Sequence, residues 1–320
     1  MRIDSLPEKQ YFREALLNWY ARNRRDLPWR RDRDPYRIWV SEIMLQQTRV
    51  VAVLGHYEKF LQRFPTVHKL AAAREASVLA AWSGLGYYRR ARNMHVAAKI
   101  IVQRAGKFPE SAAEWRLLPG IGRYTAAAIA SIASGEAVAV VDGNVKRVLS
   151  RVFGEDLAEG ELWRSAEVLL SPEQPGDFNQ ALMELGATVC LPEGPLCQNC
   201  PLIHLCATRG DLKSRRPQAP QRKREIGYAL GCKNGSVFLT RRPKEASLMP
   251  GMWELPEFRS TEKTALLTLR HSITVTNYLV RVHQATPKKR TPGQWVHRSR
   301  ITRLPLTGLT QKILRAAKII

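Results

Sequence analysis

The sequence predicts a multidomain protein in which an all-α domain precedes a smaller α+β domain, and three observations support this. Residues 11–205 repeat apolar side chains at helical spacing between Gly and Pro breaks, as in 71–82, 124–134 and 165–170. Residues 213–225 are dense in charge and proline, which is typical of a linker. The segments 226–231, 236–240, 273–283 and 294–296 are rich in β-branched or aromatic residues, as strands are. The predicted domains are therefore 1–212 and 226–320.

The charge of the chain predicts a polyanionic partner. Lysine and arginine outnumber acidic residues by 51 to 28, which gives a formal net charge of +23 in 320 residues. Residues 221–320 hold 20 basic and 5 acidic residues, so about +15 of that charge lies there. No basic amphipathic helix stands out, so we expect nucleic acid and no membrane as the partner.

The N-terminal residues MRIDSLPEKQ are charged and lack the apolar core of a secretory signal, and no apolar run is long enough to span a bilayer. We therefore expect an intracellular, cytoplasmic protein associated with DNA. Disulfides are disfavoured in that compartment.

Four of the five cysteines form the loop 190–206, with six, two and five residues between Cys190, Cys197, Cys200 and Cys206. Four thiolates in one short loop suit a [4Fe-4S] cluster, because sulfur is a soft ligand and the loop closes at small entropic cost. A zinc site usually brings together two distant Cys-x2-Cys pairs, and only one such pair is present. Zinc remains the main alternative, ahead of disulfides or free thiols. Cys232 stands apart and no role is predicted for it.

A glycine hairpin, LPGIGRYT at 118–125, leads directly into the alanine-rich segment. Gly120 and Gly122 permit a tight turn whose backbone N–H groups, next to a helix start, can bind a DNA phosphate without reading sequence. We therefore predict a helix-hairpin-helix DNA-binding element near residues 112–134.

These motifs resemble a known family. The hairpin, VVDGNVKRVLSR at 140–151 and the cysteine spacing are similar to the endonuclease III superfamily of helix-hairpin-helix DNA glycosylases. LPWRRDRDPYRIWVSEIMLQQTRV, GLGYYRRARN and FNQALMELGATVC resemble its adenine DNA glycosylases of the MutY type. The resemblance covers about residues 10–210. It implies a monomeric base excision repair enzyme that acts on double-stranded DNA and hydrolyses the N-glycosidic bond of adenine opposite 8-oxoguanine or G.

Breaking an N-glycosidic bond requires two carboxyl groups in different protonation states. Glu42 lies among apolar residues in a helix expected over residues 36–54, a setting that favours the protonated acid. Asp142 precedes a helix start, where it can also act as an N-cap. The resemblance implies that Glu42 protonates adenine and then activates water, and that Asp142 stabilises the cationic sugar.

Tyr124 falls where lyase members of the superfamily carry a lysine. A phenol cannot form a Schiff base, so we expect an abasic-site product without strand cleavage by that route. The resemblance further implies that Tyr124 supports Glu42, that Asn144 orients water or sugar, and that Glu184 lies close to the flipped adenine.

The base must leave the duplex and its place in the stack must be filled. The resemblance gives this role to Gln47 and Tyr87, and it places Trp29, Arg30 and Leu45 around the extruded base. Arg89, Arg90 and Arg92 follow Tyr87, so we expect them to face phosphate.

The segment GMWELPEF at 251–258 resembles the opening of a Nudix hydrolase fold, but the acidic helix that would hold magnesium does not follow. We expect this domain to bind 8-oxoguanine without hydrolysis. The family's Phe-Ser-His turn falls on residues 273–275, where Thr274 keeps a hydroxyl while the aromatic ring and the imidazole are gone.

Two other functions remain open at this stage. One is a glycosylase for T opposite G or for oxidised pyrimidines. The other is a non-enzymatic iron–sulfur protein that binds DNA, which leaves the two carboxylates unexplained.

Overall fold

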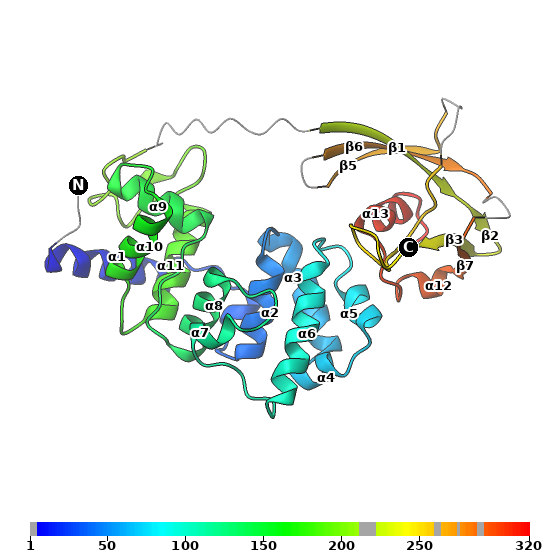
Figure 1. Cartoon of the computed structure of the whole chain (residues 1–320). Coiled ribbons are helices and arrows are strands. Elements are labelled where there is room, and N and C mark those ends of the chain that lie inside the picture. The colour runs from blue at the N-terminus through cyan, green and yellow to red at the C-terminus, as the bar shows by residue number, and fades with distance from the viewer. Residues whose placement is uncertain (1–4, 211–221, 259–263, 274–275, 287–290) are drawn as a thin grey trace. The chain divides into compact units, whose positions relative to one another are not determined.

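The computed structural model describes residues 5–210, 222–258, 264–273, 276–286 and 291–320. Contacts divide the chain into two compact units, Met1–Val50 with Ile100–Arg216 and Val51–Lys99 with Pro217–Ile320. The helices up to residue 199 precede the strands along the chain, as predicted, and two further helices follow the strands (Figure 1). The contact-based division also runs through the helical segments.

The first unit is helical. α11 packs against α1 and α9, and α2 packs against α8. Its helices are α1 Leu6–Asn23, the short η1 Pro28–Arg30, α2 Pro35–Leu45, α7 Ala112–Trp115, α8 Arg123–Ile129, the π-helical η2 Ala130–Ser134, α9 Gly143–Phe153, α10 Glu159–Leu169, α11 Pro175–Thr188 and η3 Cys197–Asn199. The buried rings of Trp39 and Trp115 lie 6.0 Å apart and join α2 to α7.

Capping residues fix where the site-bearing helices begin. The Asp34 side chain accepts hydrogen bonds from the N–H groups of Tyr36 and Arg37, and Pro35 occupies the first turn of α2. Asp142 caps α9 by accepting from the Val145 N–H, and Gly154 ends that helix in a left-handed conformation. The two caps place Glu42 and Asp142 at fixed positions on rigid elements.

The single helix expected over residues 36–54 is wrong. α2 ends at Leu45, and α3 starts at Val50 after a turn in which Gln47 has a φ of 54°. The amide of Gln46 donates to Thr125 Oγ1 at 3.0 Å, so a tertiary contact with α8 holds the chain where the helix stops. Apolar periodicity does not reveal such a break, because both helices bury the same kind of residue.

The second unit begins with four helices: α3 Val50–Arg63, α4 Val67–Ala71, α5 Glu75–Ala81 and α6 Arg89–Gln103, of which α6 extends beyond it. Phe60 and Trp82 pack edge to face with 5.9 Å between ring centroids. The turn between α5 and α6 carries Tyr87. No helix within the described residues is long and apolar enough to cross a bilayer.

Two sheets and two helices complete this unit (Figure 1). One sheet has the order β1-β6-β5, with β1 parallel and β5 antiparallel to β6; in the other, β3 pairs with β2, β4 and β7. The elements are β1 Arg222–Leu230, β2 Cys232–Lys233, β3 Ser236–Arg241, β4 Trp253–Glu254, β5 Leu267–Ile273, β6 Thr276–Gln284, β7 Gln294–His297, α12 Arg298–Ile301 and α13 Gly308–Ala316. Leu239, Leu255, Val282 and Ile313 lie in their shared core.

Two predicted segments differ from the structure here. The strand expected at 273–283 is two strands, with β5 ending at Ile273 and β6 starting at Thr276. The linker expected at 213–225 ends earlier, because β1 starts at Arg222. Pairing with β6 holds the polar first residues of β1 in a strand. Thr274 lies outside the described residues.

Candidate active site

One cavity of about 190 Å³ in the first unit is formed by residues far apart in the sequence. The helices α2, α8, α9 and α11 and the segment around η1 contribute its walls. Eight predicted site residues line it: Trp29, Arg30, Glu42, Leu45, Tyr124, Asp142, Asn144 and Glu184. Arg25, Gln180 and Met183 also line it and were not predicted.

Glu42 is buried on α2 with 6% of its surface exposed. Burial raises the pKa of Glu42 to about 7, and the nearby Asp142 charge adds to the rise, while a hydrogen bond with Tyr124 and the charge of Arg30 oppose it. Its Oε2 atom has no hydrogen-bond partner within the described residues. The carboxyl group therefore retains a proton near neutral pH and can donate it.

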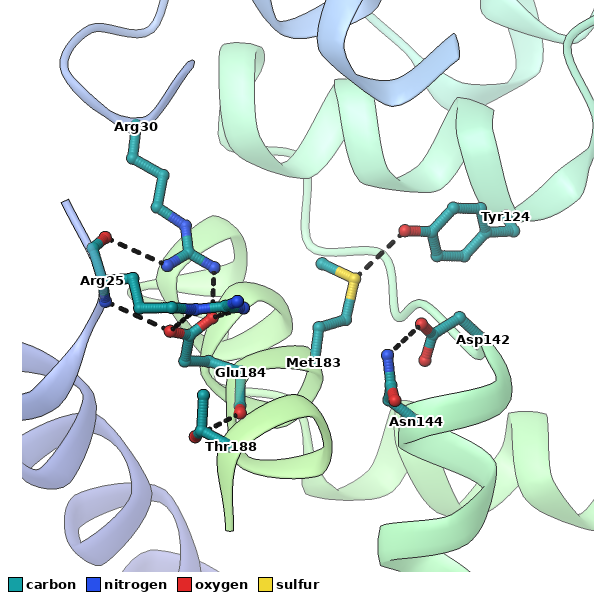
Figure 2. A network of polar contacts seen from close by, with 8 residues as sticks. All are labelled: Arg25, Arg30, Tyr124, Asp142, Asn144, Met183, Glu184 and Thr188. Carbon is teal, nitrogen blue, oxygen red and sulfur yellow. Dashed lines mark hydrogen bonds and ion pairs between the residues drawn. The ribbon is translucent and has the colours of Figure 1, made fainter. Parts of the chain in front are cut away.

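Asp142 presents a carboxylate with donors on both oxygens. Oδ1 accepts from the Val145 N–H at 2.7 Å. Oδ2 accepts from the Asn144 amide at 3.0 Å (Figure 2). Burial raises the pKa of Asp142, while these hydrogen bonds oppose the rise. N–H donors favour the ionised form, so Asp142 is the better candidate for the negative charge and Glu42 for the proton.

Tyr124 stands in the first turn of α8 and lines the same cavity as the two carboxyl groups. Its hydroxyl donates to Met183 Sδ at 3.1 Å (Figure 2). The hydroxyl also interacts with Glu42. Burial raises the pKa of Tyr124, and the charges of Glu42 and Asp142 raise it further. The phenol therefore stays protonated and can hold or deliver a proton, but it cannot act as an amine nucleophile.

Glu184 on α11 has a fully buried side chain that two arginines neutralise. Arg25 Nε lies 2.7 Å from Oε1, and Arg30 Nη2 lies 2.8 Å from Oε2 (Figure 2). Burial alone raises the pKa of Glu184, but the hydrogen bonds from the two arginines outweigh it and lower the pKa to about 2. Glu184 is thus a permanent acceptor that also orients Arg30 in the cavity wall.

Sequence reasoning missed Arg25, Gln180 and Met183 for different reasons. Gln180 and Met183 stand within FNQALMELGATVC; Gln180 lies four residues before Glu184, so helical spacing could have placed it on the face of Glu184, and Met183 lies three residues after Gln180. Arg25 belongs to the basic run after α1, in which no pattern separates it from its neighbours. Only the fold brings its guanidinium to Glu184.

Gly186 lets α11 approach the start of α9 closely. A Cβ atom at Gly186 would lie 2.6 Å from Asn144 Cβ. Arg147 binds the same junction, with Nη2 donating to Asn144 Oδ1 at 2.8 Å and Nε donating to the Cys190 carbonyl at 2.7 Å. Asp142, Asn144 and Arg147 therefore connect the cavity to the cysteine loop through hydrogen bonds.

The four cysteines of the loop lie close enough to affect one another electrostatically, and none is in a disulfide. Burial raises the pKa of Cys200 to about 11, and charges on the other three cysteines add to the rise. Arg151 donates to Cys190 Sγ at 3.2 Å. Within the described residues no three His, Cys, Asp or Glu side chains converge on one ion position. Four thiols in one loop beside a positively charged guanidinium are the donor set that an iron–sulfur cluster uses.

The remaining predicted DNA contacts lie on turns outside the cavity. Gln47, in the first unit, is exposed with a φ of 54°; Tyr87, in the second, is 49% exposed with a φ of 47°. In the hairpin, Gly120 has a φ of 81°, whereas Gly122 has an ordinary negative φ and caps α8 with open space around it. The left-handed conformation therefore requires glycine at Gly120, while Gly122 leaves the helix start accessible.

The chain is similar to known DNA repair proteins. The family described as "HhH-GPD superfamily base excision DNA repair protein" matches residues 40–169. The adenine DNA glycosylase of Homo sapiens is 50% identical over 214 residues, which cover 62% of this chain and 39% of that protein. The chain thus spans about two fifths of that relative's length. The adenine DNA glycosylase of Buchnera aphidicola subsp. Schizaphis graminum is 35% identical, with 79% of this chain and 76% of that protein covered.

Solved structures agree on the fold of the helical part. A thermostable thymine-DNA glycosylase aligns with a TM-score of 0.59 and 31% identity, covering 63% of this chain and 96% of that one. An endonuclease III–DNA complex aligns with a TM-score of 0.54 and 23% identity over the same shares. The chain matches two adenine DNA glycosylases over more than three quarters of their length at 35% identity. It therefore belongs to the adenine DNA glycosylase family, within the HhH-GPD superfamily of base excision DNA repair proteins.

Proposed function

We propose that the protein is a monofunctional adenine DNA glycosylase that removes adenine opposite 8-oxoguanine, or opposite G, by hydrolysis. One observation carries the proposal: a buried Glu42 that holds a proton near neutral pH shares a cavity with an Asp142 whose ionised form is hydrogen-bonded. This is the pair of protonation states that cleavage of an N-glycosidic bond requires.

In this proposal Glu42 gives its proton to a ring nitrogen of the flipped adenine, and the bonding electrons leave with the base. Asp142 stabilises the oxocarbenium-like sugar, and Asn144 holds the Asp142 carboxylate in place. Glu42, now ionised, takes a proton from the attacking water, and Tyr124 hydrogen-bonds to its carboxylate. The product is an abasic site, because Tyr124 supplies no amine for strand cleavage.

The cavity walls suit a neutral, planar base. Trp29 and Leu45 offer apolar surface, while Glu184, whose two oxygens already accept from Arg25 and Arg30, holds Arg30 in the wall. Arg30 bonds to Glu184 and restricts the cavity on that side. Gln47 and Tyr87 fill the space that the extruded adenine leaves; their exposed, left-handed turns are conformations that tend to cluster at functional sites.

A [4Fe-4S] cluster held by Cys190, Cys197, Cys200 and Cys206 completes the proposal. When bound, it would brace the loop that follows α11 and supply no proton or nucleophile. Replacement of Cys197 by Ser should lower iron content and weaken DNA binding more than it slows the chemical step. Full iron content in that variant would remove Cys197 from the ligand set.

Residues 226–320 are proposed to form a Nudix-like domain that reads 8-oxoguanine and does not hydrolyse nucleotides. Arg242 binds both carboxylate oxygens of Glu254, at 2.9 and 2.8 Å, so this acid is already paired. Truncation after Asp211 tests the assignment. The truncated protein should release some adenine but lose its preference for 8-oxoguanine; unchanged discrimination would refute it.

The decisive assay is single-turnover base release from duplexes with A opposite 8-oxoguanine, A opposite G, T opposite G, or thymine glycol, each with and without alkali. Alkali-dependent cleavage at adenine, fastest opposite 8-oxoguanine and absent in Glu42→Gln, supports the proposal. Release of T opposite G alone would favour the second candidate, which the similarity to a thymine-DNA glycosylase raises. Binding without release of any base would favour a non-enzymatic protein.

A further inference from the structure

Tyr87 is held in an unfavourable conformation on a short turn between α5 and α6. Its φ is 47°, although it is not glycine, and about half of its side chain is exposed. Gly84 and Gly86 in the same turn also have positive φ values, 109° and 70°. A left-handed tyrosine persists only where its surroundings fix the backbone. We refer to Ser83–Tyr88 as the Tyr87 turn.

Side chains from outside the Tyr87 turn bind its backbone carbonyl groups. Trp82 Nε1 donates to the Gly86 carbonyl at 3.1 Å. Arg90 Nη2 lies 3.3 Å from the carbonyl oxygens of both Leu85 and Gly86. From α3, His56 Nε2 lies 3.1 Å from the Ser83 carbonyl oxygen. Three carbonyl groups of the turn are thus fixed by side chains and not by regular secondary structure.

Arg90 also lies between two aromatic rings. Its guanidinium carbon is 5.4 Å from the centroid of the Trp82 ring and 5.5 Å from that of Tyr87. Burial lowers the pKa of Arg90 to about 10, so the group is substantially removed from water. The sequence predicted that Arg89, Arg90 and Arg92 face phosphate; Arg90 instead bonds within the protein, and Arg92 donates to the Pro250 carbonyl at 2.6 Å.

His56 packs against Gly84, one of the two glycines of the Tyr87 turn. A Cβ atom at Gly84 would lie 2.8 Å from His56 Nε2 and 3.1 Å from Gln311 Oε1. Any other residue at Gly84 would displace the imidazole, in addition to adopting a φ that disfavours side chains. The glycine and the histidine therefore act together on the Ser83 end of the turn, while Arg90 acts on the Gly86 end.

We propose that Arg90 and His56 are positioning residues that preset the Tyr87 turn, so that the Tyr87 ring is presented for insertion into the base stack before DNA binds. The inference rests on the proposed function, since it assigns a structural cause to the wedge role of Tyr87. A wedge that is already ordered loses less conformational entropy on insertion than one ordered by DNA. Arg90 then stabilises the turn by binding two carbonyl groups and two aromatic rings, and it does not bind a phosphate.

Unstacking can be measured without base release. A fluorescent 2-aminopurine placed beside a mispaired adenine brightens when its stack opens, and the Glu42→Gln background stops the reaction at the bound state. In that background we expect Arg90→Lys, His56→Gln and Tyr87→Ala each to reduce the fluorescence rise at saturating protein. Lys99→Arg, at an exposed position of α6 outside the Tyr87 turn, is the matched control and should keep the full rise.

Salt dependence separates positioning from a phosphate contact. If Arg90 bound a phosphate, Arg90→Gln would lower the slope of log affinity against log salt by about one. We expect no such change from Arg90→Gln, whereas Arg89→Gln provides the reference for an exposed charge. With Glu42 restored, misplacement of the wedge should slow single-turnover base release by up to about 100-fold in Arg90→Lys.

An equal fluorescence rise in Arg90→Lys, His56→Gln and the Glu42→Gln parent protein would overturn the inference. A decrease of about one in the salt-dependence slope of Arg90→Gln would also overturn it. If Arg90 variants fail to fold, Gly84→Ala provides the same test, because it leaves Arg90 intact and displaces His56. A protein that unstacks the mispair but releases no adenine would refute the proposed function and not the positioning role. A protein that releases adenine with an unstacking signal insensitive to Tyr87→Ala would refute the positioning role alone.

Discussion

The buried acid Glu42 predicts a conflict between stability and activity that a single substitution can expose. Glu42 is 6% exposed, its Oε2 atom has no partner within the described residues, and burial raises its pKa to about 7 from an ordinary value of 4.5. Glu42→Gln keeps the shape of the side chain and removes the ionisation. The variant should therefore lose base release while it gains stability at alkaline pH.

The size and sign of the gain follow from the two pKa values. Between them the unfolded chain is ionised while the folded protein keeps the proton, so wild-type stability falls as pH rises and levels off above the folded pKa of about 7. The full difference corresponds to about 3 kcal/mol. Between about pH 5.5 and about pH 8.5, the stability of Glu42→Gln relative to wild type should rise by about 2 kcal/mol.

Urea unfolding followed by tryptophan fluorescence, at both pH values and in both proteins, measures this quantity. Base release from a duplex with A opposite 8-oxoguanine, measured on the same samples, gives the functional half of the prediction. A pH-independent stability difference between the two proteins would refute the assignment of Glu42 as a buried, protonated acid. Normal turnover by Glu42→Gln would refute its role as the proton donor.

The other predictions concern the pH profile and the residues around the two carboxyl groups. Single-turnover base release by the wild-type protein should decline as pH rises through about 7, because Glu42 must be protonated to donate; a flat profile from pH 6 to 8 would contradict this. Glu184→Gln should destabilise the protein by about 3 kcal/mol in urea unfolding at neutral pH, since it leaves two arginines without their buried partner. In the wild-type protein the Glu184 carboxylate has a pKa of about 2, so it stabilises the fold above the ordinary carboxyl pKa and loses that effect only in strong acid. Gly186→Ala should cost about 1–3 kcal/mol in the same assay and slow base release, because the added methyl group meets Asn144 at 2.6 Å; wild-type stability would show that α11 can shift freely. Arg147→Lys should slow base release about tenfold at unchanged iron content, because one amine cannot reproduce the contacts of Arg147 with Asn144 and the cysteine loop; an unchanged rate would exclude that connection.

Local sequence patterns predicted much of the fold. The helical part and the later strands follow from apolar periodicity and residue type, which act over a few neighbouring residues. The errors occurred where a tertiary contact overrides that pattern. The break between α2 and α3 depends on Gln46 reaching Thr125, and the start of β1 depends on its pairing with β6.

The sequence predicted which residues form the candidate site but not their protonation states. Glu42 and Asp142 are recognisable as candidates because the chemistry requires two carboxyl groups, and a family resemblance indicates their positions. Their protonation states depend on burial and on donors from other elements. Arg25 and Arg90 show the same limit, because each is one arginine in a basic run until the fold gives it a buried partner.

The sequence by itself determined which chemistry the chain can carry: two separated carboxyl groups, a tyrosine in place of an amine, four closely spaced thiols and a large excess of positive charge. The tertiary structure decided which groups meet and in what electrostatic state. It buries Glu42 beside Asp142, neutralises Glu184 with two arginines and fixes Tyr87 in a left-handed turn. The reason is physical: residue type and spacing are local properties, whereas desolvation, ion pairing and backbone strain depend on atoms that only folding brings together.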